Sequence, residues 1–441
     1  MASTQFTFTQ SAGTNAKKFT VSMWWKPGAV DTNQGLWGCG TGTSDAVSIH
    51  YQSGGQLSLE TYDGSANPKL RTTRVLRDPA AWYHLVFSID TTDSSASERL
   101  KIWINGVEET DFITDTTITQ DSDIPGWSAA SDVMKIGNRI LDGDAFFDGE
   151  MAHVHVIDGT IYAASAFGET DSTSGIWIAK TSPSVTYGTN GGFYKFVSGA
   201  LTTDSSGESN TLTQVGSPTT TKDNPDNNFC TMNPLSSGVI NGAGMPLTNG
   251  NTTIYDGDAN WRSGFGTIGD NQGKYYFEAK MVGSSTNWWV GFLDARQVVK
   301  GEYKFVSKTR GYGVAGGGQK GNSNSEVSWG VTYAQNDIAM CALDLDNGKI
   351  YFGKNGTWSE SGDPTSGSTG TGAAYSVTTD YIYLPAVGLY DTTAGMSLNF
   401  GNGYFGTTAV SSAGTNASNI GTFEYDVPTG YTAVSTLGLM E

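Results

Sequence analysis

The sequence predicts an all-β protein built as two consecutive antiparallel β-sandwiches. Apolar and polar residues alternate in short runs, as at residues 19–25 and 83–89, which is the period of a strand with one buried face. Glycine makes up 58 of the 441 residues, and Asn-Gly pairs follow several of the runs, so tight turns are expected. The best helical candidate, residues 163–169, is short. A turn-rich sandwich protein therefore fits the pattern better than a helical one.

The first module is expected over residues 1–165. Its strand patterns are FTVSMWWKPG (19–28), WYHLVFSID (82–90), RLKIWINGVEE (99–109), IGN (136–138) and FDGEMAHVHVID (147–158). These blocks resemble a laminin-G-like, concanavalin A-type jelly roll. The resemblance implies a lectin-like sandwich that binds glycans and, in some relatives, holds a calcium ion at its rim. Acidic residues usually follow the FDG block in that family, whereas Ala152 and His153 stand here, which weakens a direct transfer of its metal ligands.

The second module, residues 236–441, is clearest at residues 337–358, DIAMCALDLDNGKIYFGKNGTW. Leucine and aspartate alternate before Asn347-Gly348, which predicts a two-residue hairpin turn, and Asn355-Gly356 predicts a second turn. Four further blocks keep a fixed order around it: GKYYFE (273–278), WWVGF (288–292), LPAVGL (384–389) and SLNFG (397–401). Together the five blocks resemble a SPRY (B30.2) domain, which implies a second sandwich. Eukaryotic members of that family mostly bind peptides through loops.

Residues 166–235 are expected to form a bridging segment that partly completes the first sandwich, with Pro225 and Pro234 flanking the boundary. DNPDNNFCTMNPL (223–235) and FEYDVPTGYTAVST (423–436) resemble segments that recur in structural proteins of marine tailed bacteriophages. In those proteins a lectin-like sandwich is often followed by a SPRY module. The resemblance implies a virion structural protein, as a head decoration or fibre, or a tail fibre.

Charge and targeting signals restrict the partners. The chain carries 43 acidic and 25 basic side chains, a formal net charge of −18, which repels phosphate backbones and anionic lipid headgroups. We therefore expect no nucleic acid and no membrane insertion. No signal peptide is visible, so the expected location is the virion, assembled in the host cytoplasm. Cys39, Cys230 and Cys341 are too far apart and too few for a disulfide framework or a zinc pattern.

No catalytic residues are expected. Jelly-roll enzymes of the laminarinase type carry their carboxylates as E-x-D-x-x-E or E-x-D-x-E, but Glu109-Thr-Asp111 and Glu169-Thr-Asp171 supply only the first two. We interpret both pairs as solvated loop acids. Residues 311–316, GYGVAG, match a dinucleotide-binding pattern, yet the glycines that follow favour no helix. The chain is therefore expected not to be an enzyme; the alternatives are a glycan-degrading enzyme with a SPRY accessory domain and a protein-interaction adaptor.

Two groups of residues are weighed as metal ligands. Asp142, Asp144 and Asp148 lie in LDGDAFFDGE, and clustered carboxylates suit calcium, although an exposed acidic turn is the favoured interpretation. His153 and His155 flank Val154, so both imidazoles are expected on one sheet face, with the valines facing the core. Two histidines without a third ligand are more typical of a polar face than of a metal site.

Ligand binding is expected from aromatic side chains of the second module, which stack on sugars or anchor peptides. Trp288 alternates with Val290 and Phe292, so it is expected in the core. The predicted ligand-binding residues are Tyr312, Trp358 and Trp289, with Tyr312 and Trp358 as surface anchors. The expected partners are a host-surface glycan or protein receptor and other virion proteins, including a second copy of this chain.

Overall fold

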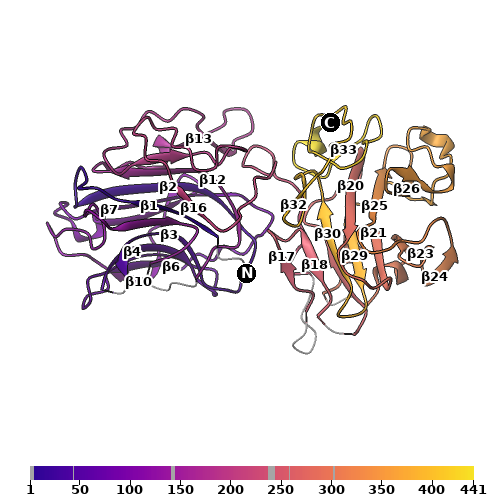
Figure 1. Cartoon of the computed structure of the whole chain (residues 1–441), viewed down its shortest axis with the longest axis horizontal. Helices are drawn as coiled ribbons and strands as arrows, with labels where there is room; N and C mark the ends of the chain where they lie inside the picture. The colour runs from indigo at the N-terminus through magenta and orange to yellow at the C-terminus, as the bar shows by residue number, and fades with distance from the viewer. Residues whose placement is uncertain (1–3, 43, 141–144, 237–243, 258, 301–302) are drawn as a thin grey trace. The chain divides into compact units, whose positions relative to one another are not determined.

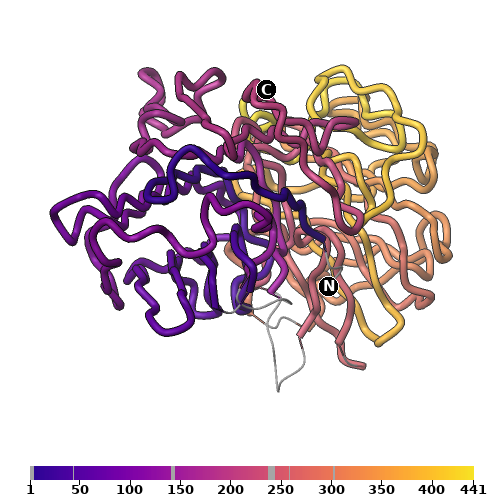
Figure 2. The backbone as a smooth tube through the Cα atoms, turned by 60° about the vertical axis from the view of Figure 1, so that its left-hand side comes forward, coloured from indigo at the N-terminus to yellow at the C-terminus, as the bar shows by residue number. Residues whose placement is uncertain are grey.

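The computed structural model describes residues 4–42, 44–140, 145–236, 244–257, 259–300 and 303–441. In these residues the chain is all-β, with strands and single 3-10 turns and no α-helix, as predicted. It divides into unit 1, Met1–Thr220, and unit 2, Thr221–Glu441, which are drawn from indigo to magenta and from pink to yellow in Figures 1 and 2. The division falls inside the expected bridging segment, residues 166–235. No helix of the described residues has the length and hydropathy to cross a membrane.

Unit 1 is a sandwich of two antiparallel sheets with an additional hairpin. The eight-stranded sheet has the order β10-β6-β5-β4-β3-β11-β1-β16, the six-stranded sheet has the order β15-β12-β2-β7-β8-β9, and β13 pairs with β14. The elements are β1 (Gln5–Thr9), β2 (Lys18–Pro27), β3 (Gln34–Gly42), β4 (Asp45–Tyr51), β5 (Leu57–Tyr62), β6 (Lys69–Thr72), β7 (Tyr83–Asp90), η1 (Ala96–Glu98), β8 (Leu100–Ile104), β9 (Val107–Glu108), β10 (Phe112–Thr116), β11 (Val133–Ile136), β12 (Gly149–Asp158), η2 (Ala164–Ala166), β13 (Gly168–Thr170), β14 (Trp177–Ala179), β15 (Gly192–Tyr194) and β16 (Thr213–Val215).

The alternation along β2 explains how this sandwich closes. Phe19, Met23 and Trp25 are buried in the core between the two sheets. Thr20, Ser22 and Trp24 point to the other face of the six-stranded sheet, where Trp24 lies against His84 of β7 with ring centroids 5.1 Å apart. That outer face is also buried, because a second apolar cluster that includes Phe167 and Phe193 covers it.

Unit 2 is a second sandwich. One sheet has the order β17-β18-β30-β20-β25-β26-β27, with β28 on β26 and β33 parallel to β20; the other has the order β19-β29-β21-β22-β23-β24. The elements are β17 (Leu247–Thr248), β18 (Thr253–Tyr255), β19 (Arg262–Phe265), β20 (Lys274–Met281), β21 (Trp288–Asp294), η3 (Ala295–Gln297), η4 (Phe305–Ser307), β22 (Gly311–Ala315), β23 (Gln319–Asn322), β24 (Ser325–Ser328), β25 (Ile338–Asp344), β26 (Lys349–Lys354), β27 (Thr357–Trp358), η5 (Ser359–Ser361), η6 (Gly367–Thr369), β28 (Tyr375–Ser376), β29 (Tyr383–Leu389), β30 (Gly395–Asn399), β31 (Tyr404–Phe405), β32 (Thr408–Ala409), β33 (Thr432–Ala433) and η7 (Gly438–Met440).

The outer face of the β20–β25–β26 layer is covered by residues 423–433. Phe423 and Tyr431 pack there with Tyr276 and Tyr351, and Phe229 joins the same cluster. The two ends of the unit also meet through a bridge between Phe229 and Ser435. The segments 223–235 and 423–436, which were singled out in the sequence, therefore belong to one layer of unit 2.

The Asn-Gly turns have two outcomes. Asn355-Gly356 forms the predicted two-residue loop, with φ of +48° and +85°. The same prediction for Asn347-Gly348 is wrong, because β25 ends at Asp344 and β26 begins at Lys349, which leaves a four-residue loop. The Asp344 carboxylate accepts the backbone N–H of Asn347 at 2.9 Å, and Leu345 is buried in the core. Because Leu345 is buried in the core, the backbone leaves the β25–β26 pairing before it reaches the Asn-Gly pair.

Candidate functional site

The three predicted ligand-binding aromatics lie in three different places of unit 2. Tyr312 on β22 faces the core between the sheets and is 8% exposed, so the expectation that it is a surface anchor is wrong. Its ring is covered by Tyr375, with centroids 5.1 Å apart. Trp289 on β21 faces the opposite side of the same sheet and is 2% exposed. Trp358 on β27 is half-buried against the layer that includes Tyr276.

Beside Tyr312 the structure gathers alternating aromatic rings and cations, which we call the aromatic–cation strip. Its members are Trp329, Lys320, Tyr375, Tyr312, Arg310, Tyr381 and Arg296. They come from β22, β23 and β28, from η3, and from the loops before β22, after β24 and before β29. Because β28 and β22 belong to different sheets, the strip joins the two sheets of the sandwich. Except for Tyr312, all its members reach the surface at least in part.

Lys320 organises the first end of the strip. Its Nζ lies 5.3 Å from the ring centroid of Trp329 and 5.3 Å from that of Tyr375, and it donates to the carbonyl oxygen of Ala374 at 2.9 Å. Burial lowers the pKa of Lys320, while the charge of Glu360 acts in the opposite direction. Both rings thus lie at the same distance from one positive charge, and cation–π attraction helps to hold them in place.

Asp294 organises the other end. Its side chain is fully buried and accepts from Arg310 Nε at 2.6 Å and from Arg296 Nη2 at 3.3 Å. Burial tends to raise the pKa of Asp294, but the hydrogen bonds from Arg310 and Arg296 hold that pKa below its usual value. The guanidinium carbons of Arg296 and Arg310 lie 3.8 Å and 4.2 Å from the ring centroid of Tyr381. The one carboxylate of this end is thus engaged by two arginines, so the strip is suited to binding rather than to proton transfer.

Trp289 belongs to a separate surface feature. The Nζ of Lys304 lies 4.8 Å from the Trp289 ring and 4.5 Å from the Trp261 ring, and it forms an ion pair with Glu326. Trp261 in turn contacts Tyr390. Trp289 is therefore the buried base of a cation–π contact, and the outer rings Trp261 and Tyr390 are the ones that reach solvent.

Of the predicted calcium ligands, Asp142 and Asp144 lie outside the described residues. Asp148 precedes β12, where its backbone N–H donates to Gln34 Oε1 at 2.9 Å. Within the described part of the chain, no group of three or more His, Cys, Asp or Glu side chains is placed to hold a metal ion. Calcium binding at this turn stays a prediction.

His153 and His155 both contact Phe193 on the outer face of the six-stranded sheet, while Val154 and Val156 lie in the core, as expected. His155 is buried, and its Nδ1 is 2.9 Å from the hydroxyl of Tyr187. Burial lowers the pKa of His155 well below its usual value. This histidine is therefore a neutral packing residue, bonded within the protein on its Nδ1.

The two candidate catalytic acids, Glu109 and Glu169, lie in different surroundings. Glu109 is only 7% exposed and forms an ion pair with Arg74 at 3.0 Å, so its interpretation as a solvated loop acid is wrong. Burial raises the pKa of Glu109, and Arg74 acts against that shift. Glu169 is exposed on β13, and Asp171 caps a turn by accepting the backbone N–H of Ser174 at 2.7 Å. Residues 311–315 of the glycine-rich stretch form strand β22 rather than a loop, and β22 pairs with β23 in a hairpin, so the stretch leads into a second strand and not into a helix.

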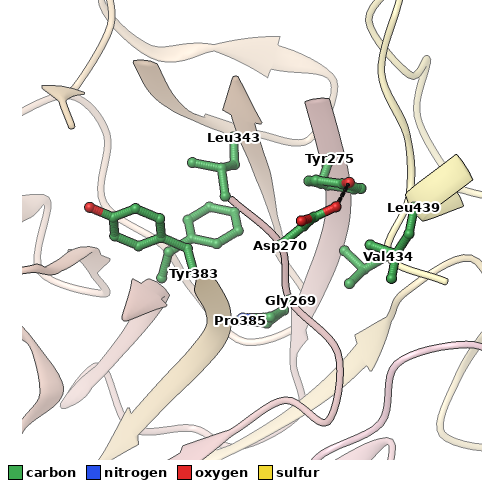
Figure 3. A pocket seen from close by; sticks show the side chains of 9 residues that line it. Gly269, Asp270, Tyr275, Leu343, Tyr383, Pro385, Val434 and Leu439 are labelled. Atoms are coloured by element: carbon green, nitrogen blue, oxygen red, sulfur yellow. Dashed lines mark hydrogen bonds between the residues drawn. The ribbon is translucent and has the colours of Figure 1, made fainter. Parts of the chain in front are cut away.

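A small pocket in unit 2 is lined mainly by apolar side chains (Figure 3). Its lining residues are Gly269, Asp270, Tyr275, Phe292, Leu343, Tyr383, Pro385, Val434 and Leu439. The hydroxyl of Tyr275 donates to Asp270 Oδ2 at 2.8 Å, as the dashed line shows. A pocket with a single carboxylate lacks the pair that glycoside hydrolysis requires.

Comparison with known proteins agrees with the two sandwiches. Residues 2–165 match the model of the concanavalin A-like lectin/glucanases superfamily, and residues 274–403 match that of the SPRY domain. The SPRY domain of human HERC1 is 18% identical over 35% of this chain and 91% of its own, with a TM-score of 0.29. The heptameric SAP-like pentraxin of Limulus polyphemus is 17% identical over 41% of this chain and 86% of its own, with a TM-score of 0.30. No curated protein sequence matches the chain.

Proposed function

Because the chain carries a concanavalin A-like/laminin G domain followed by a SPRY domain, we propose that it is a binding protein without enzymatic activity. Its ligand is a glycan or a protein receptor. The observation that carries this proposal is the aromatic–cation strip, where Trp329, Tyr375 and Tyr381 reach the surface beside three cations. Aromatic faces next to charged donors suit recognition, whereas catalysis would need an available acid or base.

We further propose that the protein is a structural component of a phage virion, as a head decoration, a fibre or a tail fibre. The support is the similarity of residues 223–235 and 423–436 to segments of marine phage structural proteins. These two segments pack in one layer of unit 2, through Phe229, Phe423 and Tyr431, so they resemble one continuous structural feature rather than two isolated motifs. A particle would present the sandwiches of many copies, which strengthens weak individual contacts by multivalency.

Binding is tested with the full chain on an array of bacterial envelope glycans and surface peptides. Replacing Trp329 or Tyr375 by alanine should weaken binding about tenfold or more, because one stacked ring contributes about 1–3 kcal/mol. Tyr255→Ala is the matched control, since Tyr255 is an exposed tyrosine of β18 outside the strip. Equal losses in all three variants would contradict a binding role for the strip.

The virion assignment is tested by electron microscopy of purified particles with an antibody against this chain. Regular labelling of heads or tails is expected, and particles that never label would overturn the assignment. The absence of enzymatic activity is tested separately by incubating the chain with the same glycans and assaying released oligosaccharides. Release that disappears in Glu109→Gln or Glu169→Gln would replace the binding role by glycan degradation.

A further inference from the structure

We propose that the Asp294 end of the aromatic–cation strip is a subsite for the carboxylate or sulfate group of an anionic glycan. This inference rests on the proposed function, because it names the ligand class of the same strip. The subsite consists of Arg296 and Arg310, with Tyr381 against both guanidinium groups.

The two arginines keep donors that the protein does not use. Arg310 gives Asp294 its Nε, and Arg296 gives Asp294 its Nε and Nη2. In the described structure, the two Nη atoms of Arg310 have no protein acceptor, and the Nη1 atom of Arg296 has none either. The side chains of Arg296 and Arg310 are 61% and 29% exposed, so these planar donors can be reached from solvent. Unused guanidinium N–H pairs match the two oxygens of a carboxylate or sulfate.

The protein has already oriented both groups. Asp294 fixes their Nε sides from within the fold, and the Tyr381 ring limits their rotation, so little side-chain entropy remains to be lost on binding. Two guanidinium groups share one buried carboxylate, which leaves one positive charge uncompensated at this end. Asp380 precedes Tyr381 in the chain, and the charge of Glu360 acts on Lys320, but neither carboxylate accepts a hydrogen bond from these arginines in the described structure.

The remainder of the strip favours a sugar polymer over an acidic peptide. Rings and positive groups alternate along it, from Trp329 and Lys320 through Tyr375 to the arginines around Tyr381. A polysaccharide with charged substituents repeats in the same way, because each sugar ring offers an apolar C–H face and each substituent offers acceptor oxygens. Stacking and charge recognition would then operate on successive units of one chain.

The test uses the full chain and two matched pairs of polymers. Polygalacturonate is compared with its fully methyl-esterified form, and dextran sulfate with dextran, so that the members of each pair share one sugar backbone and differ in the charged substituent. The two pairs separate carboxylate from sulfate. Affinity electrophoresis or calorimetry should give at least about tenfold tighter binding to one charged member. Arg296→Gln should remove about that factor while Asp294 keeps Arg310. Lys280→Gln, which removes a cation of β20 outside the strip, should leave binding unchanged.

The outcomes separate the inference from the proposed function. Equal binding of charged and neutral members, still lost in Trp329→Ala, would overturn the anionic subsite and leave the binding role intact. Polyglutamate bound as tightly as polygalacturonate would overturn the choice of a sugar. No binding of any polymer would overturn the anionic subsite and leave a protein receptor as the ligand of the proposed function. Tyr381→Ala provides a second variant, and it should weaken binding to the charged polymers more than Lys280→Gln; circular dichroism confirms that each variant is folded.

Discussion

Glu278 is a buried carboxylate of β20 on which two opposing effects act. Its oxygens accept the backbone N–H groups of Glu424 at 2.9 Å and Tyr425 at 2.8 Å, and Tyr276 and Asn399 donate to it as well. All four donors favour the charged form. Burial nevertheless raises the pKa of Glu278 to about 7, the hydrogen bonds limiting the shift. One side chain therefore holds the covering segment of unit 2 in place and makes it sensitive to pH.

The sign of this sensitivity is opposite to that of an ordinary ion-paired carboxylate. Between the usual pKa near 4.5 and the folded value of about 7, the folded protein holds a proton that the unfolded chain has lost. The free energy of unfolding of unit 2 should fall by up to about 3 kcal/mol as pH rises through this window. Urea unfolding of the natural protein and of Glu278→Gln between pH 5 and pH 8 measures it. A natural protein whose pH dependence equals that of the variant would contradict the prediction.

At the scale of elements, the β13–β14 hairpin docks on unit 1 through Trp177. The indole N–H donates to Nδ1 of His84 at 3.0 Å, and Nε2 of His84 then donates to Ser22 Oγ at 2.9 Å. Gly106 and Gly168 leave the room for the indole ring, since a Cβ on either would come within 2.6 Å of it. The hydrogen bond to His84 and the close contact with Gly106 thus attach the hairpin to the six-stranded sheet, while Gly168 lets the indole ring lie close to the backbone of the hairpin itself.

Trp177→Phe keeps most of the apolar contact but leaves His84 Nδ1 without its donor. The expected loss is about 1–3 kcal/mol in the free energy of unfolding, the cost of a buried unsatisfied acceptor. Hydrogen exchange should show the loss first in residues 168–179. Ile176→Ala, a change at an exposed neighbour in the same hairpin, should stay within about 0.5 kcal/mol. A similar loss in both variants would mean that the hairpin is held by general packing.

At the scale of the whole molecule, titratable groups are unevenly divided between the units. All four histidines lie in unit 1. Burial lowers the pKa of His84 to about 3, and burial together with the charge of Arg139 lowers the pKa of His50 to about 3. Because the unfolded chain binds protons near pH 6.5 that the folded unit refuses, acid destabilises unit 1. Glu278 gives unit 2 the opposite tendency.

Calorimetry of the full chain should therefore show two transitions that separate between pH 7 and pH 5. The free energy of unfolding of unit 1 should fall by roughly 2 kcal/mol per buried histidine by pH 5, so its midpoint temperature should fall. The midpoint temperature of unit 2 should stay constant or rise. Glu278→Gln assigns the transitions, since it should move only the one from unit 2. Two midpoints that fall together would show that the charges of the exposed acids dominate instead.

The sequence was sufficient to predict where strands form, but not which distant residues cover the side chains of those strands. Alternation places Phe19, Met23 and Trp25 in the core because it depends only on neighbouring residues. Tyr312 was expected near a loop or strand end, whereas it lies within β22. Whether its ring is exposed depends on Tyr375, which is far away in the chain.

The contacts of Arg296 and Arg310 with Tyr381, and the ion pair of Arg74 with Glu109, escaped prediction for the same reason. Arg296, Arg310 and Tyr381 lie in loops or at strand ends without a periodic pattern, and only the folded sheets bring them together. A local signal does exist for half of the site. Asp294 and Arg296 are two residues apart at the end of a strand, a spacing that lets the carboxylate cap the following turn.

Cys39, Cys230 and Cys341 are all buried thiols, one in unit 1 and two in unit 2. Burial raises the pKa of Cys39 and Cys341 well above the usual value, so these sulfurs are shielded and uncharged while the protein is folded. A brief pulse of an alkylating reagent would then modify each sulfur only when its own sandwich has opened. Peptide mass spectrometry of the modified cysteines would then record which of the two sandwiches unfolds first.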